Sequence, residues 1–187
     1  NFVLPRVELP LNVDILRSPQ EPLSKTTSVH GTLLSPDHIS VVNYPNMPEY
    51  NPEEVVVLFP SEDAKSVSDV VNMEKLKTVI FIDCQWHSVG QFLRDERIIN
   101  LPHVKITSKQ SYYWRYHHRN KGQVEDCLCT IEAIYHFFCE YHKHKIGDYD
   151  GSYDNLLYYF SYFYRLIQNR YKASGKDFSK IKGWLKK

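Results

Sequence analysis

The sequence predicts a single α/β domain with a largely parallel sheet. Short apolar runs alternate along the chain with segments of helical spacing, an order typical of strand–helix units. The run from Thr78 to Ile82 is uncharged, lacks Gly and Pro and is rich in strand formers, as expected of an inner strand covered on both faces. The length of 187 residues allows one substantial core and is short for two domains.

Before Thr78, strands are predicted where apolar residues alternate or run continuously, and helices where they recur three or four positions apart. The predicted elements are a strand at 11–16, a short helix within 23–34, strands at 39–42 and 55–59, and a helix, short or interrupted, at 62–73. At the start of the first helix, the hydroxyl groups of Thr26, Thr27 and Ser28 could cap it or hold an anion.

After the central run, the same rules predict a helix at 86–97, a strand at 101–107, and amphipathic helices at 126–144 and 154–171. The last helix carries an aromatic stripe, which we expect in the hydrophobic core rather than in a cofactor site: Tyr158, Tyr159, Tyr162 and Phe163. We therefore expect one domain over residues 1–172, followed by a basic tail over residues 173–187.

Composition narrows the class of protein. The chain contains no apolar run as long as a membrane span and no signal-peptide pattern at its start. Its four cysteines (Cys84, Cys127, Cys129, Cys139) include no C-x-x-C pair, so we expect reduced thiols in an intracellular protein rather than a zinc ribbon or a disulfide framework. Because the first residue is Asn1 and not Met, we expect a fragment whose natural N-terminus lies upstream.

The net charge of +1 hides an uneven distribution of charge. Residues 97–124 contain six Lys or Arg and no acid, and residues 170–187 contain seven against Asp177 alone. Two basic segments in a nearly neutral protein indicate a polyanionic partner. For the tail, a solvated charged face is the alternative.

Asp83 is the candidate catalytic residue. It ends the central run, and Trp86 follows three residues later. Ligands of open α/β sheets bind at the carboxyl ends of the strands, so a carboxylate there suits chemistry. Asp is also a common helix N-cap, and on position alone both roles stay open.

The residues from Asp83 to Trp86 resemble the Asp-x-Thr-Trp motif of the DTW-domain family. Further blocks resemble segments of that family in the same order along the chain: Lys25–His30, Val57–Pro60, Arg94–Arg97, Trp114-Arg115, Leu128–Ala133 and Tyr153–Leu157. The last block is similar to the eukaryotic branch of the family. The resemblance covers about residues 9–170.

The resemblance implies a tRNA-uridine aminocarboxypropyltransferase. Such an enzyme moves the 3-amino-3-carboxypropyl group of S-adenosylmethionine onto N3 of a D-loop uridine of tRNA and releases 5′-methylthioadenosine. It also implies a SPOUT-like fold with a C-terminal trefoil knot, an exception to the rule that chains are unknotted. Gln85 replaces the Thr of the motif, and the Cys-rich N-terminal segment of the family, a zinc site, is absent from this sequence.

In this family's fold the donor lies against loops after three neighbouring strands. The resemblance therefore implies these donor-binding residues: Phe59, Pro60, Ser61, Asp83, Trp86, Leu128, Thr130, Glu132 and Ala133. Asp83 would be the general base that removes the N3 proton. Glu132 is either a ligand or an acid in the first helical turn, favoured by the helix dipole.

The expected RNA-binding residues are mostly basic or aromatic: Lys25, Thr26, Arg97, Lys109, Tyr113, Trp114, Arg115, Arg119 and Lys121. Residues 112–116 form either an aromatic strand or a platform on which a uridine stacks. Lys25, Thr26 and Thr27 could approach the donor or the RNA. The histidines lack a ligand set, so no metal is expected.

Two other functions share these features. A SPOUT-type methyltransferase would use the same donor but transfer its methyl group, and a non-catalytic module would bind tRNA only. We expect a monomer with no membrane association. The basic tail and the family resemblance favour the nucleus, with the cytoplasm as the alternative.

Overall fold

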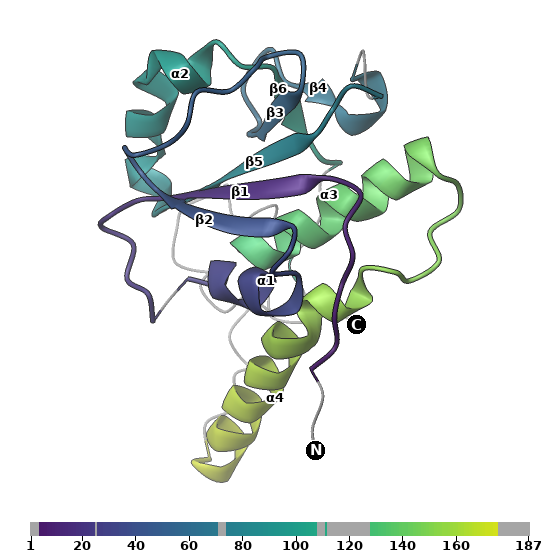
Figure 1. Ribbon diagram of the computed structural model, residues 1–187. Coiled ribbons are helices and arrows are strands. Elements are labelled where there is room, and N and C mark those ends of the chain that lie inside the picture. Colours follow the sequence, from purple (N-terminus) through teal and green to yellow (C-terminus); the bar gives the residue numbers. More distant parts are fainter. Residues whose placement is uncertain (1–3, 25, 71–73, 108–110, 112–127, 176–187) are drawn as a thin grey trace.

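The protein forms an α/β domain built on one parallel sheet (Figure 1). The computed structural model describes residues 4–24, 26–70, 74–107, 111 and 128–175, with the backbone alone at Trp86 and His87. The strands are β1 (Asn12–Arg17), β2 (Ile39–Asn43), β3 (Val55–Leu58), β4 (Lys65–Ser66), β5 (Thr78–Asp83) and β6 (His103–Lys105). Their order is β2-β1-β5-β3-β6-β4, and all neighbours are parallel. The carboxyl ends of the strands therefore meet at one edge.

Strand β5 lies in the middle of this sheet, which confirms the prediction for the central run. It pairs with β1 through Arg17 and Asp83 in register, and with β3 through Leu58 and Phe81. Val79 and Ile80 point to opposite faces of the strand, and both are fully buried. A continuous apolar run is what such a doubly covered strand requires.

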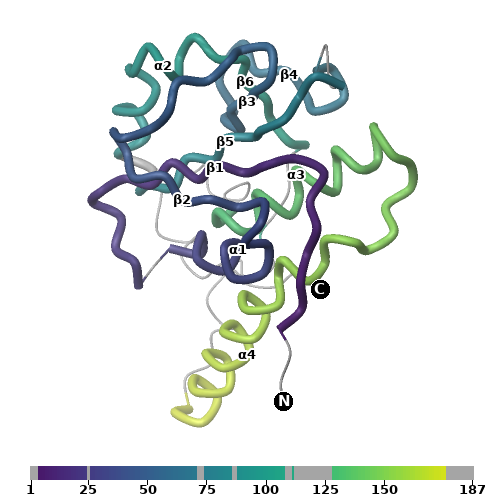
Figure 2. Tube along the Cα trace, viewed as in Figure 1, coloured from purple at the N-terminus to yellow at the C-terminus, as the bar shows by residue number. Residues whose placement is uncertain are grey.

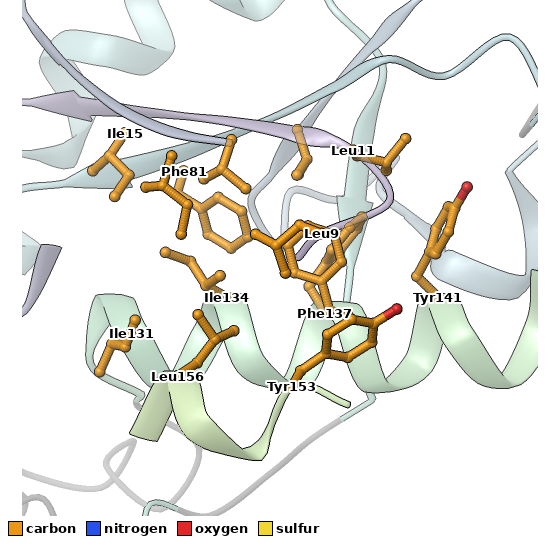
Figure 3. Packing of buried hydrophobic residues seen from close by; sticks show 14 of the residues in the cluster. Leu9, Leu11, Ile15, Phe81, Ile131, Ile134, Phe137, Tyr141, Tyr153 and Leu156 are labelled. Carbon is orange, nitrogen blue, oxygen red and sulfur yellow. The ribbon is translucent and has the colours of Figure 1, made fainter. Parts of the chain in front are cut away.

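Helices cover both faces of the sheet. One face packs against α1 (Ser28–Leu34), α3 (Thr130–Lys145), the 3₁₀ helix η4 (Asp154–Leu157) and the start of α4 (Tyr158–Ala173). Figure 3 shows this core, in which Phe81 of the sheet meets Phe137 of α3 edge to face with ring centroids 6.0 Å apart. The other face packs against the 3₁₀ helix η2 (Trp86–Arg94) and α2 (Glu96–Ile99) through a smaller core around Phe92 and Ile98.

Gly31 brings α1 close to its neighbours. A Cβ atom at this position would lie 3.0 Å from Ile39 Cδ1 of β2 and 3.6 Å from Ile131 Cδ1 of α3. The absence of a side chain thus lets α1 pack closely against the sheet and α3. This packing positions the residues at the start of α1.

Two predicted helices differ in the structure. The segment 62–73 contains β4 and the 3₁₀ helix η1 (Val67–Asp69), while residues 71–73 lie outside the described residues. Here the Ser66 hydroxyl donates a hydrogen bond of 2.6 Å to Asp69, a local bond of the kind that competes with helix formation. The segment 86–97 is divided into η2 and α2 at Asp95, whose carboxylate accepts from Arg97 N at 3.0 Å and caps α2.

The prediction that the aromatic stripe of the last helix lies in the core is wrong for half of its residues. Tyr162 is 56% exposed and Phe163 is 44% exposed, whereas Tyr158 and Tyr159 pack partly against the core. The reason is that α4 extends beyond the sheet (Figure 1), so only its first turns reach buried residues. Within the described residues, no helix has the length and hydropathy needed to cross a membrane.

Candidate active site at the carboxyl edge of the sheet

The Asp83 carboxylate lies buried at the carboxyl end of β5, with 5% of the residue exposed. The Thr26 hydroxyl donates a hydrogen bond to Asp83 Oδ2, and the Thr130 hydroxyl donates to Oδ1 at 2.8 Å. Asp83 therefore joins the segment before α1 to the first residue of α3. It does not cap the following helix, because the N-cap of η2 is Gln85. The capping alternative for Asp83 is wrong.

The hydroxyl groups before α1 hold this arrangement together. Thr26 Oγ1 lies 2.8 Å from Ser28 Oγ and accepts a hydrogen bond from Ser28 N at 3.0 Å. Thr27 Oγ1 accepts from Ile131 N of α3 at 3.2 Å. All three hydroxyl residues are buried. Thr27 thus satisfies an N–H group at the start of α3 and makes no side-chain cap on α1, for which it is the N-cap residue.

The start of α3 is closed by a capping box. Glu132 accepts from Cys129 N at 3.2 Å, and the Cys129 side chain accepts from the Glu132 backbone N–H. The Ser111 hydroxyl also donates to Glu132, at 2.7 and 2.8 Å to its two oxygens. Burial raises the pKa of Glu132 above its ordinary value. These contacts place Glu132 in the first turn of α3 as part of its capping box, and a contact of Glu132 with the donor stays a prediction.

The loop after β3 lies beside the end of β5. Its register pairs Leu58 with Phe81, so Phe59, Pro60 and Ser61 continue along the same edge as Asp83. Ser61 Oγ lies 2.9 Å from His103 Nδ1, and this bond ties the loop to β6. Two of the three predicted donor-binding loops, those after β3 and β5, are therefore neighbours. The third, at the start of α3, reaches Asp83 through the hydrogen bond from Thr130.

Other predicted donor residues differ in their positions. Leu128 is half-buried two residues before α3, and Ala133 packs against the main core. Trp86 begins η2 three residues after Asp83. Burial raises the pKa of the Cys84 thiol to about 11, and burial also raises the pKa of the Cys129 thiol well above its ordinary value. Both thiols are therefore protonated at neutral pH and are poor nucleophiles.

Two predicted RNA-binding residues are described. Thr26 belongs to the buried hydroxyl cluster. Arg97 forms a two-pronged pair with Asp95, with Nε–Oδ1 at 3.0 Å and Nη2–Oδ2 at 2.7 Å. The other predicted RNA-binding residues lie outside the described residues: Lys25, Lys109, Tyr113, Trp114, Arg115, Arg119 and Lys121. In the ranges that the structure describes, no three His, Cys, Asp or Glu side chains are placed to hold a metal ion.

Ser18 and Gln91 belong to this edge but were not identified in the sequence. Ser18 N donates to the Asp83 carbonyl at 3.0 Å, and Gln91 Nε2 donates to Ser18 Oγ at 3.3 Å. Ser18 is 1% exposed. The sequence does hold a signal for Ser18, because this residue directly follows a predicted strand. Parallel strands end at a common edge, so a polar residue after one strand lies near those that follow its neighbours.

Comparison with known proteins gives the family. The model of the DTW domain matches residues 2–168. Proteins named tRNA-uridine aminocarboxypropyltransferase 1 are similar to the chain: the one from Xenopus laevis is 35% identical over 92% of this chain and 73% of its own length. The one from Mus musculus is 34% identical over 92% and 70%, and the one from Homo sapiens is 31% identical over 91% and 70%. No solved structure matches the chain significantly. By its sequence over nearly the whole chain, this protein belongs to the DTW-domain family.

Proposed function

We propose that this protein transfers the 3-amino-3-carboxypropyl group of S-adenosylmethionine to N3 of a uridine in the D-loop of tRNA. The released product is 5′-methylthioadenosine. The relatives are named as transferases of this group to tRNA uridine. The structural observation that supports the proposal is the buried Asp83 carboxylate, held from both sides by threonine hydroxyls at the ligand-binding edge of the sheet.

The reaction defines what the site must provide. A bond forms between uridine N3 and the carbon next to the donor's sulfonium, the carbon–sulfur bond breaks with its electron pair on sulfur, and N3 loses its proton. Because N3 is a poor nucleophile while protonated, a base within hydrogen-bond reach assists the attack. Asp83 is that base in our proposal.

The two hydrogen bonds that the Asp83 carboxylate accepts still leave it able to act as a base. A carboxylate has about four acceptor sites on its two oxygens, and the hydroxyls of Thr26 and Thr130 occupy one on each oxygen. The remaining sites can accept the N3–H group. The two hydroxyls fix the carboxylate in one orientation, which is how a positioned group lowers a barrier.

The residues at this edge fit the donor as well. The acidic side chain of Asp83 suits a donor with a sulfonium and an ammonium group, and the loop Phe59–Ser61 follows the neighbouring strand β3 at the same edge of the sheet. The donor supplies an activated carbon that needs no protein nucleophile. Direct transfer to uridine agrees with the protonated state of the thiols of Cys84 and Cys129.

The experiment is incubation with S-adenosylmethionine and unmodified tRNA, followed by mass analysis of both products. We expect 5′-methylthioadenosine and a tRNA uridine heavier by one aminocarboxypropyl group. S-adenosylhomocysteine with a methylated base would instead identify a methyltransferase. Binding of tRNA without any turnover of the donor would identify a non-catalytic module. Digestion of the product tRNA before mass analysis locates the modified uridine and tests the D-loop assignment.

Three finer points belong to the same proposal. The sheet would be of the SPOUT-like type with a C-terminal trefoil knot, which an experimental structure of the whole chain tests. The transferase domain would span residues 1–172, with residues 173–187 as a basic tail. The protein would act in the nucleus as a monomer, which imaging of the tagged protein and sedimentation test.

A further inference from the structure

Helix α4 carries an exposed surface that the active site does not use. The helix extends away from the sheet, as the tube in Figure 2 shows. Its 16 residues make it about 24 Å long. Beyond its first turn most of its side chains are exposed or half-buried, and Phe160 is its one buried residue. Because so few of its side chains are buried, packing on the core stabilises α4 little. Its exposed side chains are therefore available to a partner.

The exposed side chains on this helix combine aromatic rings with cations. We define the α4 face as Tyr162, Phe163, Arg165, Arg170 and Lys172, all of which are exposed. Positions three, four or seven apart lie on one side of a helix. Tyr162 and Arg165 are three apart, whereas Phe163 and Arg170 are seven apart, as are Arg165 and Lys172. At about 100° per residue, Phe163 and Arg170 therefore project from one side of the helix, Arg165 and Lys172 from a side about 160° away, and Tyr162 from between them. Each of the two sides thus has a cation next to a ring.

All the charged residues of this face are cations. Helix α4 contains no Asp or Glu. Among the residues that the structure describes, Arg165, Arg170 and Lys172 form no ion pair with a carboxylate. Cations without local counter-charges attract a polyanion.

The α4 face is also connected to the candidate active site. His30 of α1 packs against two rings of α4: its ring centroid lies 5.8 Å from that of Phe163, with the two rings nearly parallel, and 5.8 Å from that of Tyr159. Helix α1 begins two residues after Thr26, whose hydroxyl binds Asp83. A molecule on the α4 face would thus bind to a helix that packs against α1. The segment before α1 holds the Asp83 carboxylate through Thr26.

We propose that the α4 face binds the tRNA outside the reacting uridine. Arg165, Arg170 and Lys172 contact phosphates, and Tyr162 and Phe163 stack on unpaired bases. Cations along a helix with aromatic rings between them are the combination that binds unpaired RNA. This inference rests on the proposed function, because it takes the tRNA as the substrate.

Other partners suit this face less well. A helix that lies on a membrane keeps its apolar and cationic residues on separate faces, whereas here Phe163 lies beside Arg170 and Tyr162 lies beside Arg165. The core of a protein–protein interface is depleted in charged residues, whereas this face has three cations. This mixing of rings and cations thus favours RNA over a lipid surface or a second protein.

The test compares variants in tRNA binding at several salt concentrations. One variant removes the charges together (Arg165→Ala, Arg170→Ala and Lys172→Ala), and a second keeps the apolar bulk but removes the rings (Tyr162→Leu and Phe163→Leu). The control removes two exposed lysines from the last turn of α3, away from α4 (Lys143→Ala and Lys145→Ala). Thermal unfolding of each variant confirms that it folds.

The charge variant should bind unmodified tRNA at least tenfold more weakly, with a slope of log Kd against log salt lower by about 2 to 3. The ring variant should lose roughly fivefold or more in affinity with the parent's slope, and the control should bind like the parent. Parental affinity and slope in the charge variant would overturn the inference while leaving the proposed function intact. Binding of the parent to phosphatidylserine vesicles through this face, without tRNA binding, would also overturn it. A parent that neither binds nor modifies tRNA would contradict the proposed function itself.

Discussion

Thr26 and Asp83, 57 positions apart in the sequence, are joined by a buried hydrogen bond from the threonine hydroxyl to the carboxylate. The bond connects the segment before α1 to the end of the central strand. Together with the bond from Thr130, it gives the carboxylate two fixed donors from two different elements. A carboxylate without such partners at a strand end could rotate freely. The two threonine hydroxyls therefore fix the orientation of the Asp83 carboxylate.

Removal of either hydroxyl should slow the reaction. In Thr26→Val or Thr130→Val the side chain keeps its shape, but Asp83 loses one hydrogen bond to a charged group, worth roughly 1.5–3 kcal/mol. We expect kcat to fall about 10- to 100-fold, while the Kd for tRNA changes little. Single-turnover kinetics and a tRNA-binding titration measure the two effects separately.

The matched controls are Thr26→Ser and Thr130→Ser, which restore the hydroxyl. Because a purely structural role would depend on the methyl group as well, both serine variants should recover most of the parental kcat. Equal losses in the valine and serine variants would show that the hydroxyls do not position Asp83.

Protonation of His30 should destabilise the protein in weak acid. Burial lowers the pKa of His30 to about 4, and its Nδ1 has no hydrogen-bond partner among the described residues. In the unfolded chain the pKa is near 6.5, so between pH 6.5 and 4 the unfolded state binds more protons than the folded state. The free energy of unfolding must therefore fall as the pH drops through this range.

The variant His30→Phe keeps a ring against Tyr159 and Phe163 but cannot take up a proton. Urea unfolding at pH 7.5 and at pH 4.5 should show that the parent loses on the order of 2 kcal/mol more than this variant. His144→Phe, which replaces an exposed histidine at the end of α3, serves as the control. Identical pH dependence in the parent and His30→Phe would contradict the account of His30.

The link between η2 and α2 should depend on the charge of Asp95. Hydrogen bonds from Arg97 lower the pKa of Asp95 to about 2. A lowered carboxyl pKa contributes stability above the unfolded value near 3.9, and this contribution is lost as the pH falls toward 2. Asp95→Asn, which keeps an acceptor for the cap, should cost on the order of 1 kcal/mol at pH 7.

This difference between the parent and Asp95→Asn should vanish as the pH is lowered from about 4 to about 2, as measured by urea unfolding. The exposed Asp63→Asn is the control for loss of a carboxylate. A difference that stays constant down to pH 2 would show that the charge of Asp95 plays no part.

Much of the sheet could be predicted because its signals are local. The continuous apolar run of β5 indicated an inner strand, and the rule for parallel sheets placed Asp83 at the ligand-binding edge. The hydrogen bond between Thr130 and Asp83 joins residues 47 positions apart. Such a contact depends on how the helices pack, and no local pattern contains that information.

The errors have physical causes of the same kind. Helical spacing in residues 86–97 indicated one helix, but the side chain of Asp95 bonds to the backbone two residues later and starts a new one. The aromatic residues of α4 have helical spacing throughout. Spacing alone does not tell how far a helix overlaps its sheet, so the exposure of Tyr162 and Phe163 was not predictable.

The central claim is that Asp83 acts in the transfer to uridine, and Asp83→Asn tests it most directly. This variant keeps the size of the side chain and removes its charge. Parent and variant would be incubated with S-adenosylmethionine and unmodified tRNA, and the modified uridine quantified by mass analysis beside a measurement of tRNA binding. The account predicts that the variant binds tRNA like the parent and forms at least 100-fold less product. Product formation at the parental rate would contradict it.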